Sequence, residues 1–480
     1  MSHGALLLVA AVGVALLLLM IIKAKIQPFV ALVVVSIGVA LTAGVPAAEL
    51  VATIEEGMGS TLGHIATIIA LGAMIGRIIE LSGGAASLAH SLMDRFGEKR
   101  TPLALTAAGF LLGIPVFFEV GLIILMPIAY GVARASRKPL LVYALPMGAA
   151  MLTVHAFLPP HPGAVAAATT IGADQGWVLL FGIPVTAVVI LLGYLLAKRM
   201  TRREYPMTAD VYAKVFGEGD DSEAGSEHGP GSGHGSGHGS GSGSEPAPKT
   251  GVEGAENPPS FGMVVSLIVT PIALILLGTI GTNFLPDGST LRAVLTVLGA
   301  PMVALLVAAA LAAYFLGARR GWSSARISEV MGSALPGVAM VILVAGAGGV
   351  FGKVLVKTGI GDAVADVLDR TGLPLLALAF AMTMLLRAVQ GSTTVALVTT
   401  AGLITPLLQR TDLSPQQLAL VCLAMGAGGL SVSHINDAGY WMFTRLVGLD
   451  VGDGLRTWTV LTTVMGVAGF LLTSLLWLVV

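Results

Sequence analysis

Long apolar runs separated by short polar segments fill this chain from end to end. A helix needs about 20 consecutive apolar residues to cross the hydrocarbon core of a bilayer. Full-length candidates lie near residues 4–22, 26–44, 62–81, 140–172, 177–197, 262–283, 291–316, 334–352, 416–447 and 456–479. The pattern therefore predicts an all-α polytopic membrane protein.

Two further apolar stretches, residues 103–135 and 374–409, are interrupted at their centres. The segment PVFFEVG breaks the first stretch, and RAVQGSTT breaks the second. Irregular backbone at membrane depth is tolerated where it is buried in protein or lines a cavity, as in the discontinuous helices of transporters. We therefore expect two re-entrant hairpins.

The chain also contains an internal repeat. LMDRFG at residues 92–97 corresponds to VLDRTG at 367–372, the first hairpin break corresponds to the second, and HAFLPPHPG corresponds to SHINDAGYW. Three matches in order, at offsets of roughly 270 to 280 residues, favour a true repeat over chance. Between the copies, a segment rich in Gly, Ser, Glu, His and Pro has too little apolar surface to fold. We predict a first membrane half at residues 1–200, a disordered cytoplasmic linker at 201–260 and a second half at 261–480.

The distribution of positive charge sets the expected orientation. With the N-terminus outside, 20 of the 26 Lys and Arg residues lie on the cytoplasmic side. The remainder are Arg387, within the second hairpin, and, on the outside, Arg292, Lys353, Lys357, Arg370 and Arg410. Because short cytoplasmic loops carry an excess of Lys and Arg, this orientation is favoured. It also makes the two halves inverted repeats, whose hairpins enter the membrane from opposite sides.

Composition narrows the function classes. Of the 480 residues, 55% are apolar and 11% are charged, and the mean hydropathy is +0.88, which excludes a soluble globular protein. The net charge of −1 gives no basic field for nucleic acid. Cys422 is the single cysteine, so a disulfide framework and a thiolate metal site are excluded. The chain contains no HExxH pair, GxSxG elbow or complete P-loop, so we predict neither an enzyme nor a bound metal or other cofactor.

Glu119 and Arg387 are charged residues inside the two interrupted stretches. Glu119 has long apolar flanks, where an unpaired carboxylate costs several kcal/mol and usually serves a function. We predict proton coupling at Glu119, with hydrogen bonds from hairpin-tip amides as the structural alternative. Arg387 offers a fork of donors that matches a carboxylate, and its structural alternative is an ion pair with Glu119 or Asp437.

Polar groups follow Arg387 directly in the sequence. Gly391 permits a tight turn, so that hydroxyls and the exposed amides of a half-helix N-terminus can surround one anion. Together with Arg387, the residues predicted to bind substrate here are Gln390, Ser392, Thr393 and Thr394.

Prolines mark a further break in the first half. Pro159, Pro160 and Pro162 stop a helix between His155 and His161, and a broken helix exposes backbone groups to a ligand. We predict that both histidines bind substrate, with satisfied core histidines as the alternative.

The corresponding break in the second half is GGLSVSHINDAGYWMF. Ser433 and Asn436 suit the hydroxyls of a polyol, and we predict that they bind substrate. His434 or Asp437 can take up a proton if burial shifts its affinity, so we predict proton coupling there. The alternative is a polar network that holds the break together.

At HAFLPPHPGAVAA, RAVQGSTTVA and SHINDAGYW, the sequence resembles the gluconate permease family of gluconate:proton symporters, and the likeness extends through both halves. The resemblance implies uptake of gluconate or a related sugar acid with protons across a bacterial inner membrane. It also implies the elevator-type fold of the wider ion transporter group. Carriers of that group are commonly dimers, although the sequence itself leaves a homodimer open. The Gly/Ser/His linker is longer than the usual connection in the family and lies outside the predicted site.

Other functions stay open alongside this one. Idonate, fructuronate, glycerate and D-serine are alternative substrates, because the sequence does not define the shape of the pocket. A sodium-coupled carrier or a sodium/proton antiporter is less favoured, since an antiporter needs a carboxylate cluster and no polyol-binding groups. A membrane-embedded enzyme or scaffold would leave the paired hairpins and broken helices unexplained.

Deletion of most of residues 222–246 should leave transport largely intact, because a flexible spacer of this composition makes no packed contacts. The measurement is substrate uptake in vesicles, with membrane insertion of the variant checked in parallel. Lost uptake at normal insertion would indicate that the linker is regulatory.

Overall fold

A computed structural model describes residues 1–216, 258–360, 363 and 374–480, apart from the side chains of Ile22 and His64. Over these residues the regular secondary structure is helical throughout, and nine helical segments are long and apolar enough to cross a membrane. The prediction of an all-α polytopic membrane protein is confirmed.

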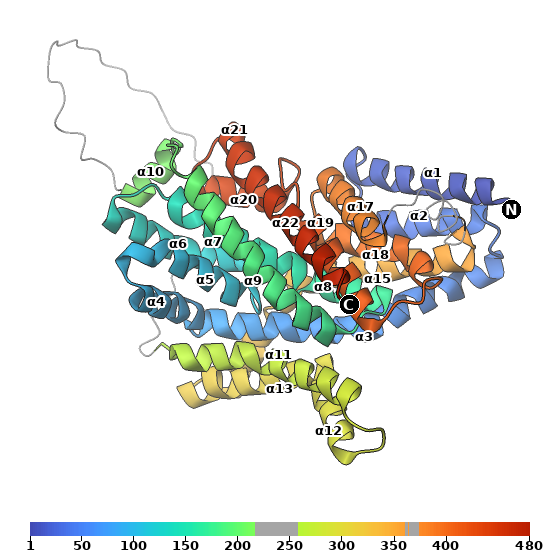
Figure 1. The fold of residues 1–480 in the computed structure, drawn as a ribbon, viewed down its shortest axis with the longest axis horizontal. Coiled ribbons are helices and arrows are strands. Elements are labelled where there is room, and N and C mark those ends of the chain that lie inside the picture. Colours follow the sequence, from blue (N-terminus) through green and yellow to red (C-terminus); the bar gives the residue numbers. More distant parts are fainter. Residues whose placement is uncertain (217–257, 361–362, 364–373) are drawn as a thin grey trace, which may run out of the picture.

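The first half forms the blue to green helices, α1 to α10, in Figure 1. Their bounds are α1 His3–Ile22, α2 Pro28–Thr42, α3 Ala47–Leu81, α4 Gly84–Phe96, α5 Thr101–Gly113, α6 Phe118–Ser136, α7 Leu141–Phe157, α8 Pro162–Ile171, α9 Gln175–Met200 and α10 Ala209–Phe216.

The second half comprises the helices from α11 to α22. Its bounds are α11 Phe261–Phe284, α12 Thr290–Gly299, α13 Pro301–Ala312, α14 Ser324–Gly332, α15 Leu335–Lys357, α17 Leu375–Gln390, α18 Thr393–Leu408, α19 Pro415–Leu430, α20 Ala438–Val447, α21 Val451–Gly454 and α22 Val460–Trp477.

Two predicted spans differ from the observed helices. The helix predicted at residues 62–81 begins earlier, at Ala47, and is α3. Its first turns carry polar side chains, so a search for apolar runs does not detect them. The span predicted at 291–316 is divided into α12 and α13. The cause is Pro301, which disfavours the helical conformation at the preceding residue, and Ala300 is extended with φ −58° and ψ 125°.

Helices α3 and α15 form a long antiparallel pair that we call the spine. In Figure 1, α3 extends along much of the length of the molecule. The Nζ atom of Lys357, at the end of α15, lies 2.8 Å from Oε2 of Glu49 near the start of α3. Lys353, one turn earlier in α15, pairs with Glu56. Just beyond the Lys353–Glu56 pair the helices touch at glycine: a Cβ on Gly349 would lie 2.6 Å from the carbonyl oxygen of Gly57. Small residues therefore allow the two backbones to approach closely.

The packing of the two halves is alike. In the first half α7 packs against α5 and α9, and in the second half α19 packs against α17 and α22. The corresponding helices α3 and α15 pack against each other in antiparallel directions. The predicted repeat is therefore visible in the fold. The LMDRFG match falls partly on residues 367–372, which lie outside the described residues.

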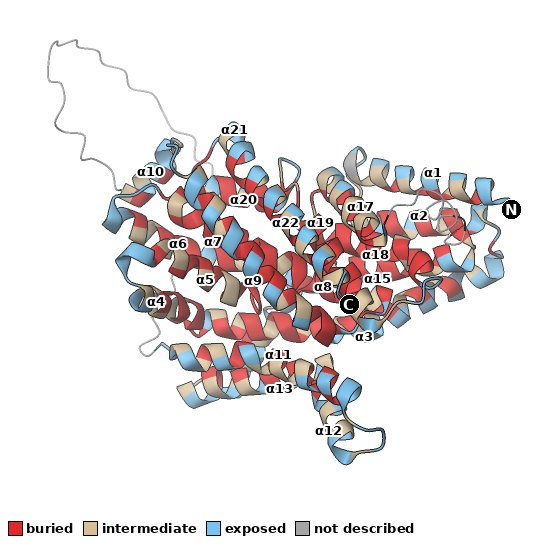
Figure 2. Cartoon of the chain, viewed as in Figure 1, coloured by how far each residue is buried: buried red, intermediate tan, exposed pale blue. Residues whose placement is uncertain are grey.

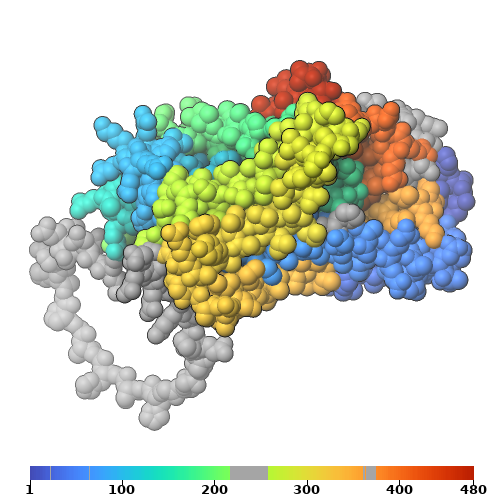
Figure 3. Space-filling view, turned by 90° about the horizontal axis from the view of Figure 1, so that it is seen from below, coloured from blue at the N-terminus to red at the C-terminus, as the bar shows by residue number. Residues whose placement is uncertain are grey.

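Burial separates the inner helices from the outer ones. Helices α7, α18 and α19 are buried along most of their length, whereas outer helices expose large apolar side chains (Figure 2). Examples are Leu8 and Val12 on α1, Leu191 and Leu195 on α9, and Leu471 on α22. Exposed apolar faces of this kind suit contact with lipid. On one side of the molecule, α11–α13 lie across the surface beside α3 (Figure 3).

Part of the predicted linker, residues 201–260, is helical. Residues 209–216 form α10, whose Val211 and Val215 lie one helical turn apart and are buried. Arg134 of α6 donates a 2.6 Å hydrogen bond to the carbonyl oxygen of Val215, which holds α10 in place. The overall composition of residues 201–216 does not reveal this short amphipathic helix. Residues 217–257 lie outside the described residues.

The variant Gly349→Ala should destabilise the protein by about 1–3 kcal/mol, because its Cβ would overlap the Thr61 hydroxyl and crowd the Gly57 backbone. Thermal unfolding of the purified protein in detergent measures the effect. The matched control is Gly337→Ala on the same helix, where a Cβ meets no atom within 4 Å. Equal unfolding temperatures for the two variants would contradict close packing of the spine.

Candidate functional site

Four helix breaks meet at the centre of the molecule. They are the α5–α6 and α17–α18 connections, which are the predicted hairpin tips, and the α7–α8 and α19–α20 connections. His161 at the α7–α8 break stacks edge-on against Phe117 of the first tip, with ring centroids 5.4 Å apart. A Cβ on Gly163 of α8 would lie 3.1 Å from the Cα of Thr394 on α18. The sequence therefore brings irregular backbone from both halves to one place.

Gly391 forms the tip of the second hairpin. Its φ of +80° is left-handed, and a Cβ at this position would overlap the carbonyl oxygen of Asn436. Glycine is required for both reasons. Ser392 follows and caps α18 by accepting a 3.3 Å hydrogen bond from the backbone N–H of Val395.

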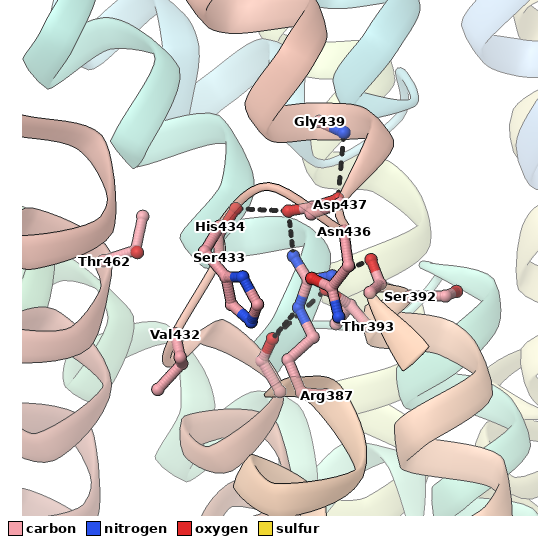
Figure 4. A network of polar contacts seen from close by, with 12 residues as sticks. Arg387, Ser392, Thr393, Val432, Ser433, His434, Asn436, Asp437, Gly439 and Thr462 are labelled. Carbon is pink, nitrogen blue, oxygen red and sulfur yellow. Dashed lines mark hydrogen bonds and ion pairs between the residues drawn. The ribbon is translucent and has the colours of Figure 1, made fainter. Parts of the chain in front are cut away.

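The side chain of Arg387 is the central group of the site (Figure 4). It is 1% exposed, and each of its three nitrogens donates a hydrogen bond. Nε donates to the Gly429 carbonyl at 3.1 Å, Nη1 donates to the Gly391 carbonyl, and Nη2 pairs with the Asp437 carboxylate. Of the two ion pairs considered from the sequence, the structure forms the one with Asp437.

Asp437 is held by more than the arginine. Its Oδ1 accepts a 2.9 Å hydrogen bond from the backbone N–H of Gly439, and its Oδ2 accepts one from the Ser433 hydroxyl. The Ser433 oxygen in turn accepts a 2.7 Å hydrogen bond from the Trp458 indole. The hydroxyl of Ser433, which we predicted to bind substrate, is therefore already engaged within the protein.

Residues on either side of this ion pair join α17 and α18 to the α19–α20 break. His434 Nε2 lies 2.8 Å from the carbonyl oxygen of Ala388, and the Asn436 amide donates to the same oxygen. The Thr393 hydroxyl donates a 3.1 Å hydrogen bond to the Gly429 carbonyl. Hydrogen bonds of Arg387, Thr393, Ser433, His434, Asn436 and Asp437 thus connect the two regions, whereas Gln390 Nε2 has no partner among the described residues.

His155 and His161 lie side by side across the α7–α8 break, with ring centroids 3.9 Å apart. His155 belongs to the last turn of α7, and His161 is the residue before α8. Within the described structure, Nδ1 of each ring is buried without a hydrogen-bond partner, and so is Nε2 of Gln390. Buried polar groups are usually paired, so these three atoms are suited to bind a ligand.

Glu119 lies in the first turn of α6 and is partly buried. It is close enough to Asp437 and Arg387 to interact with both electrostatically, and His155 interacts with the same pair. The predicted candidates of both halves are therefore gathered around the Arg387–Asp437 pair. Within the described residues, no group of three or more His, Cys, Asp or Glu side chains is arranged to hold a metal ion.

Sequence reasoning missed two contributors to the site. Trp458 falls within the apolar span predicted at residues 456–479. Its indole N–H donates a hydrogen bond to the Ser433 hydroxyl and so orients that side chain. A buried Trp N–H usually needs a partner, and this was the available signal. The carbonyl of Gly429 accepts hydrogen bonds from both Arg387 and Thr393, a role that a glycine in an apolar run does not reveal.

Comparison with known proteins decides the family. The model of the GntP family permease matches residues 5–231 and 244–480. The chain belongs to this family. It is 48% identical to the inner membrane permease YgbN of Escherichia coli K12 over the full length of both chains. It is 37% identical to the gluconate permease of Bacillus subtilis, over 99% of this chain and 100% of that one.

The fold also matches a solved transporter. The structure of MtrF from Neisseria gonorrhoeae, described as an antimetabolite efflux pump, aligns with a TM-score of 0.58 at 14% identity over 93% of each chain. At this identity the match concerns the fold alone. Because the relatives of this GntP family member are permeases and transporters, the prediction of a transporter rather than an enzyme is confirmed.

Asp437→Ala should lower the free energy of unfolding by about 3 kcal/mol or more, because it leaves the buried Arg387 charge unpaired. The double variant Arg387→Met/Asp437→Leu should unfold at a higher temperature than Asp437→Ala, since it removes both charges. Thermal unfolding in detergent compares the two. A double variant that is no more stable than the single one would show that the ion pair is not the dominant contact.

Proposed function

We propose that this GntP family permease imports gluconate or a closely related sugar acid together with protons across the bacterial inner membrane. Two named relatives support the proposal. One is the gluconate permease of Bacillus subtilis, and the other is the inner membrane permease YgbN. The proposed orientation has the N-terminus outside, as the Lys and Arg distribution favours.

The observation that carries the proposal is the buried Arg387–Asp437 pair beside three unpaired polar atoms. A guanidinium fork is the preferred partner of a carboxylate. In the described structure the Asp437 carboxylate occupies that position. A substrate carboxylate can bind Arg387 in the same way once Asp437 releases it.

Proton uptake by Asp437 provides that release. Without substrate, Arg387 and Asp437 contribute one positive and one negative charge. When Asp437 takes up a proton and a substrate carboxylate binds Arg387, the site again holds one charge of each sign. A net charge at membrane depth is costly, so the proton and the anion bind best together. This exchange couples the substrate to one proton.

Hydroxyl groups of the sugar acid are proposed to bind around this ion pair. The unpaired Nδ1 atoms of His155 and His161 and the Nε2 atom of Gln390 offer hydrogen bonds to them. Ser392, Thr393, Thr394 and Asn436 remain the other proposed substrate contacts. Ser433 is proposed to act through Asp437, because its hydroxyl already donates to that carboxylate.

Glu119 and His434 remain proposed carriers of the coupled proton. Glu119 is proposed to exchange a proton with Asp437, because the charges of the two carboxylates interact. His434 Nε2 is bound to the Ala388 carbonyl, which leaves its other ring nitrogen for proton exchange. Among the three candidates, the contacts favour Asp437 as the group that alternates with the substrate.

Uptake should be driven by an inward proton gradient and be indifferent to sodium, because the carboxylate exchange requires a proton. Asp437→Asn should still bind gluconate, yet it should lose concentrative uptake, since Asn cannot take up and release a proton. The measurement is uptake of labelled gluconate into proteoliposomes under imposed pH gradients, with and without sodium. Excess idonate, fructuronate, glycerate and D-serine added as competitors identify the preferred acid.

The control is Glu329→Gln, because Glu329 forms an exposed ion pair with Arg326 at 3.0 Å. It should transport like the parent. Sodium-dependent uptake that ignores pH would overturn the proton assignment. Concentrative, pH-driven uptake by Asp437→Asn would exclude Asp437, and the same result for Glu119→Gln would exclude Glu119.

A further inference from the structure

A second polar cavity lies away from the central site, where the C-terminal ends of α8 and α18 meet the spine. Its volume is about 670 Å³, within the range of roughly 300–1,000 Å³ typical of small-molecule sites. Polar side chains of five different helices or their ends contribute to its lining. They include Thr61, Thr170, Gln175, Lys353, Thr405 and Gln409.

This cavity is separate from the Arg387 site. Thr393 stands at the first turn of α18 beside Arg387, and Thr405 stands near its last turn. Twelve residues of helix at 1.5 Å per residue place them about 18 Å apart. A molecule bound at Thr405 therefore does not touch the central ion pair.

Two residues that line the cavity each carry a buried polar atom with no partner within the described part of the chain. Gln175 is 8% exposed, and its Oε1 accepts no hydrogen bond. The buried Oγ1 of Thr170 is also unpaired. By contrast, the Thr405 hydroxyl donates to the Ala401 carbonyl at 2.7 Å, as an ordinary helical threonine does. The unpaired carbonyl of Gln175 suits a ligand that donates hydrogen bonds, such as a hydroxyl group.

The cavity lining carries one positive side chain, Lys353, and one negative side chain, Asp174. The Lys353 side chain is 36% exposed, and its ion pair partner Glu56 is 62% exposed. Exposed ion pairs contribute little, so the ammonium group can interact with a second carboxylate. Asp174 also lines the cavity, and its Oδ1 accepts hydrogen bonds from the Trp177 N–H and the Thr279 hydroxyl, both at 2.9 Å.

We propose that this cavity is an outer subsite that binds the hydroxylated carboxylate before it reaches Arg387. Lys353 attracts the carboxylate, and Gln175 and Thr170 bind hydroxyls of the chain. The predicted orientation places the loops at residues 172–175 and 409–414 outside, so the cavity faces the side from which substrate arrives. The subsite rests on the proposed function for its substrate class.

The test uses substrate protection of an introduced cysteine in the full chain. Cys422 is the single cysteine and is buried, so Cys422→Ala gives a background without thiols. Gln409→Cys then places a thiol at an exposed position of the lining, and Asp412→Cys places one nearby but outside it. Right-side-out membrane vesicles are labelled with a membrane-impermeant maleimide, with and without potassium gluconate.

At about ten times its dissociation constant, gluconate should slow the labelling of Gln409→Cys about tenfold and leave Asp412→Cys unchanged. Adding Gln175→Ala should raise the half-protecting concentration about fivefold, the effect of one lost hydrogen bond. Adding Lys353→Gln should reduce protection by gluconate to that given by glucitol, its neutral polyol counterpart. These two variants test the hydroxyl and carboxylate contacts separately.

Repeating the protection assay with Arg387→Lys separates the subsite from the central site. This variant should fail to transport, because a point charge cannot replace the guanidinium fork, yet gluconate should still protect Gln409→Cys. An unchanged labelling rate without gluconate verifies that the variant is folded. Protection without uptake in the parent would uphold the subsite and contradict the proposed function.

Four results would overturn the subsite in a chain that transports gluconate. One is an absence of protection at Gln409→Cys, and another is equal protection at Asp412→Cys. A third is loss of protection in Arg387→Lys, which would show that the thiol senses the central site. The fourth is a Gln409→Cys thiol that does not react from outside, which would contradict the outward location of the cavity.

Discussion

The buried guanidinium of Arg387 is the constraint on which the centre of this protein depends. A charge at that depth is stable only if its donors are paired and its charge is balanced. Two backbone carbonyls accept hydrogen bonds from its donors, and the Asp437 carboxylate balances its charge. Both carbonyls come from glycine residues at helix ends, because Gly429 lies in the last turn of α19 and Gly391 directly follows α17. Breaks in the helices are therefore part of how the charge is accommodated, because an intact helix keeps its carbonyls bonded to itself.

The breaks are in turn stabilised by contacts between distant parts of the chain. The left-handed turn at Gly391 lies against the backbone of Asn436, and Ala388 accepts hydrogen bonds from the α19–α20 break. Trp458, in the short helical turn just before α22, donates a hydrogen bond to Ser433, and Ser433 in turn binds Asp437. A change in the charge of Asp437 therefore alters several contacts between α17, α18 and the α19–α20 break. Such a network can respond to the protonation of one group with a movement of whole helices.

The spine also contacts α18, the helix that begins at the central site. Close contact at Gly57 and Gly349 brings α3 and α15 together, and α15 also packs against α18. The central site lies at the start of α18, and the second cavity lies near its end against the spine. One helix thus connects both polar regions. Its hydroxyl-rich sequence, with Thr393, Thr394, Thr399, Thr400 and Thr405, places polar groups along a segment that is otherwise buried.

The sequence by itself determined the class of the protein and the positions of its breaks. Apolar run length and proline or glycine interruptions are local properties, so the membrane helices and the segments around Pro160, Gly391 and Asn436 could be predicted from them. The same reasoning placed Arg387 and Asp437 among the candidates. It could not choose between Glu119 and Asp437 as the partner of Arg387, because residues 50 positions or more apart meet only through the packing of several helices. Tertiary structure alone decided that pairing, the engagement of Ser433 by Trp458 and the cavity beside Lys353, since each depends on distances between helices that no local pattern encodes.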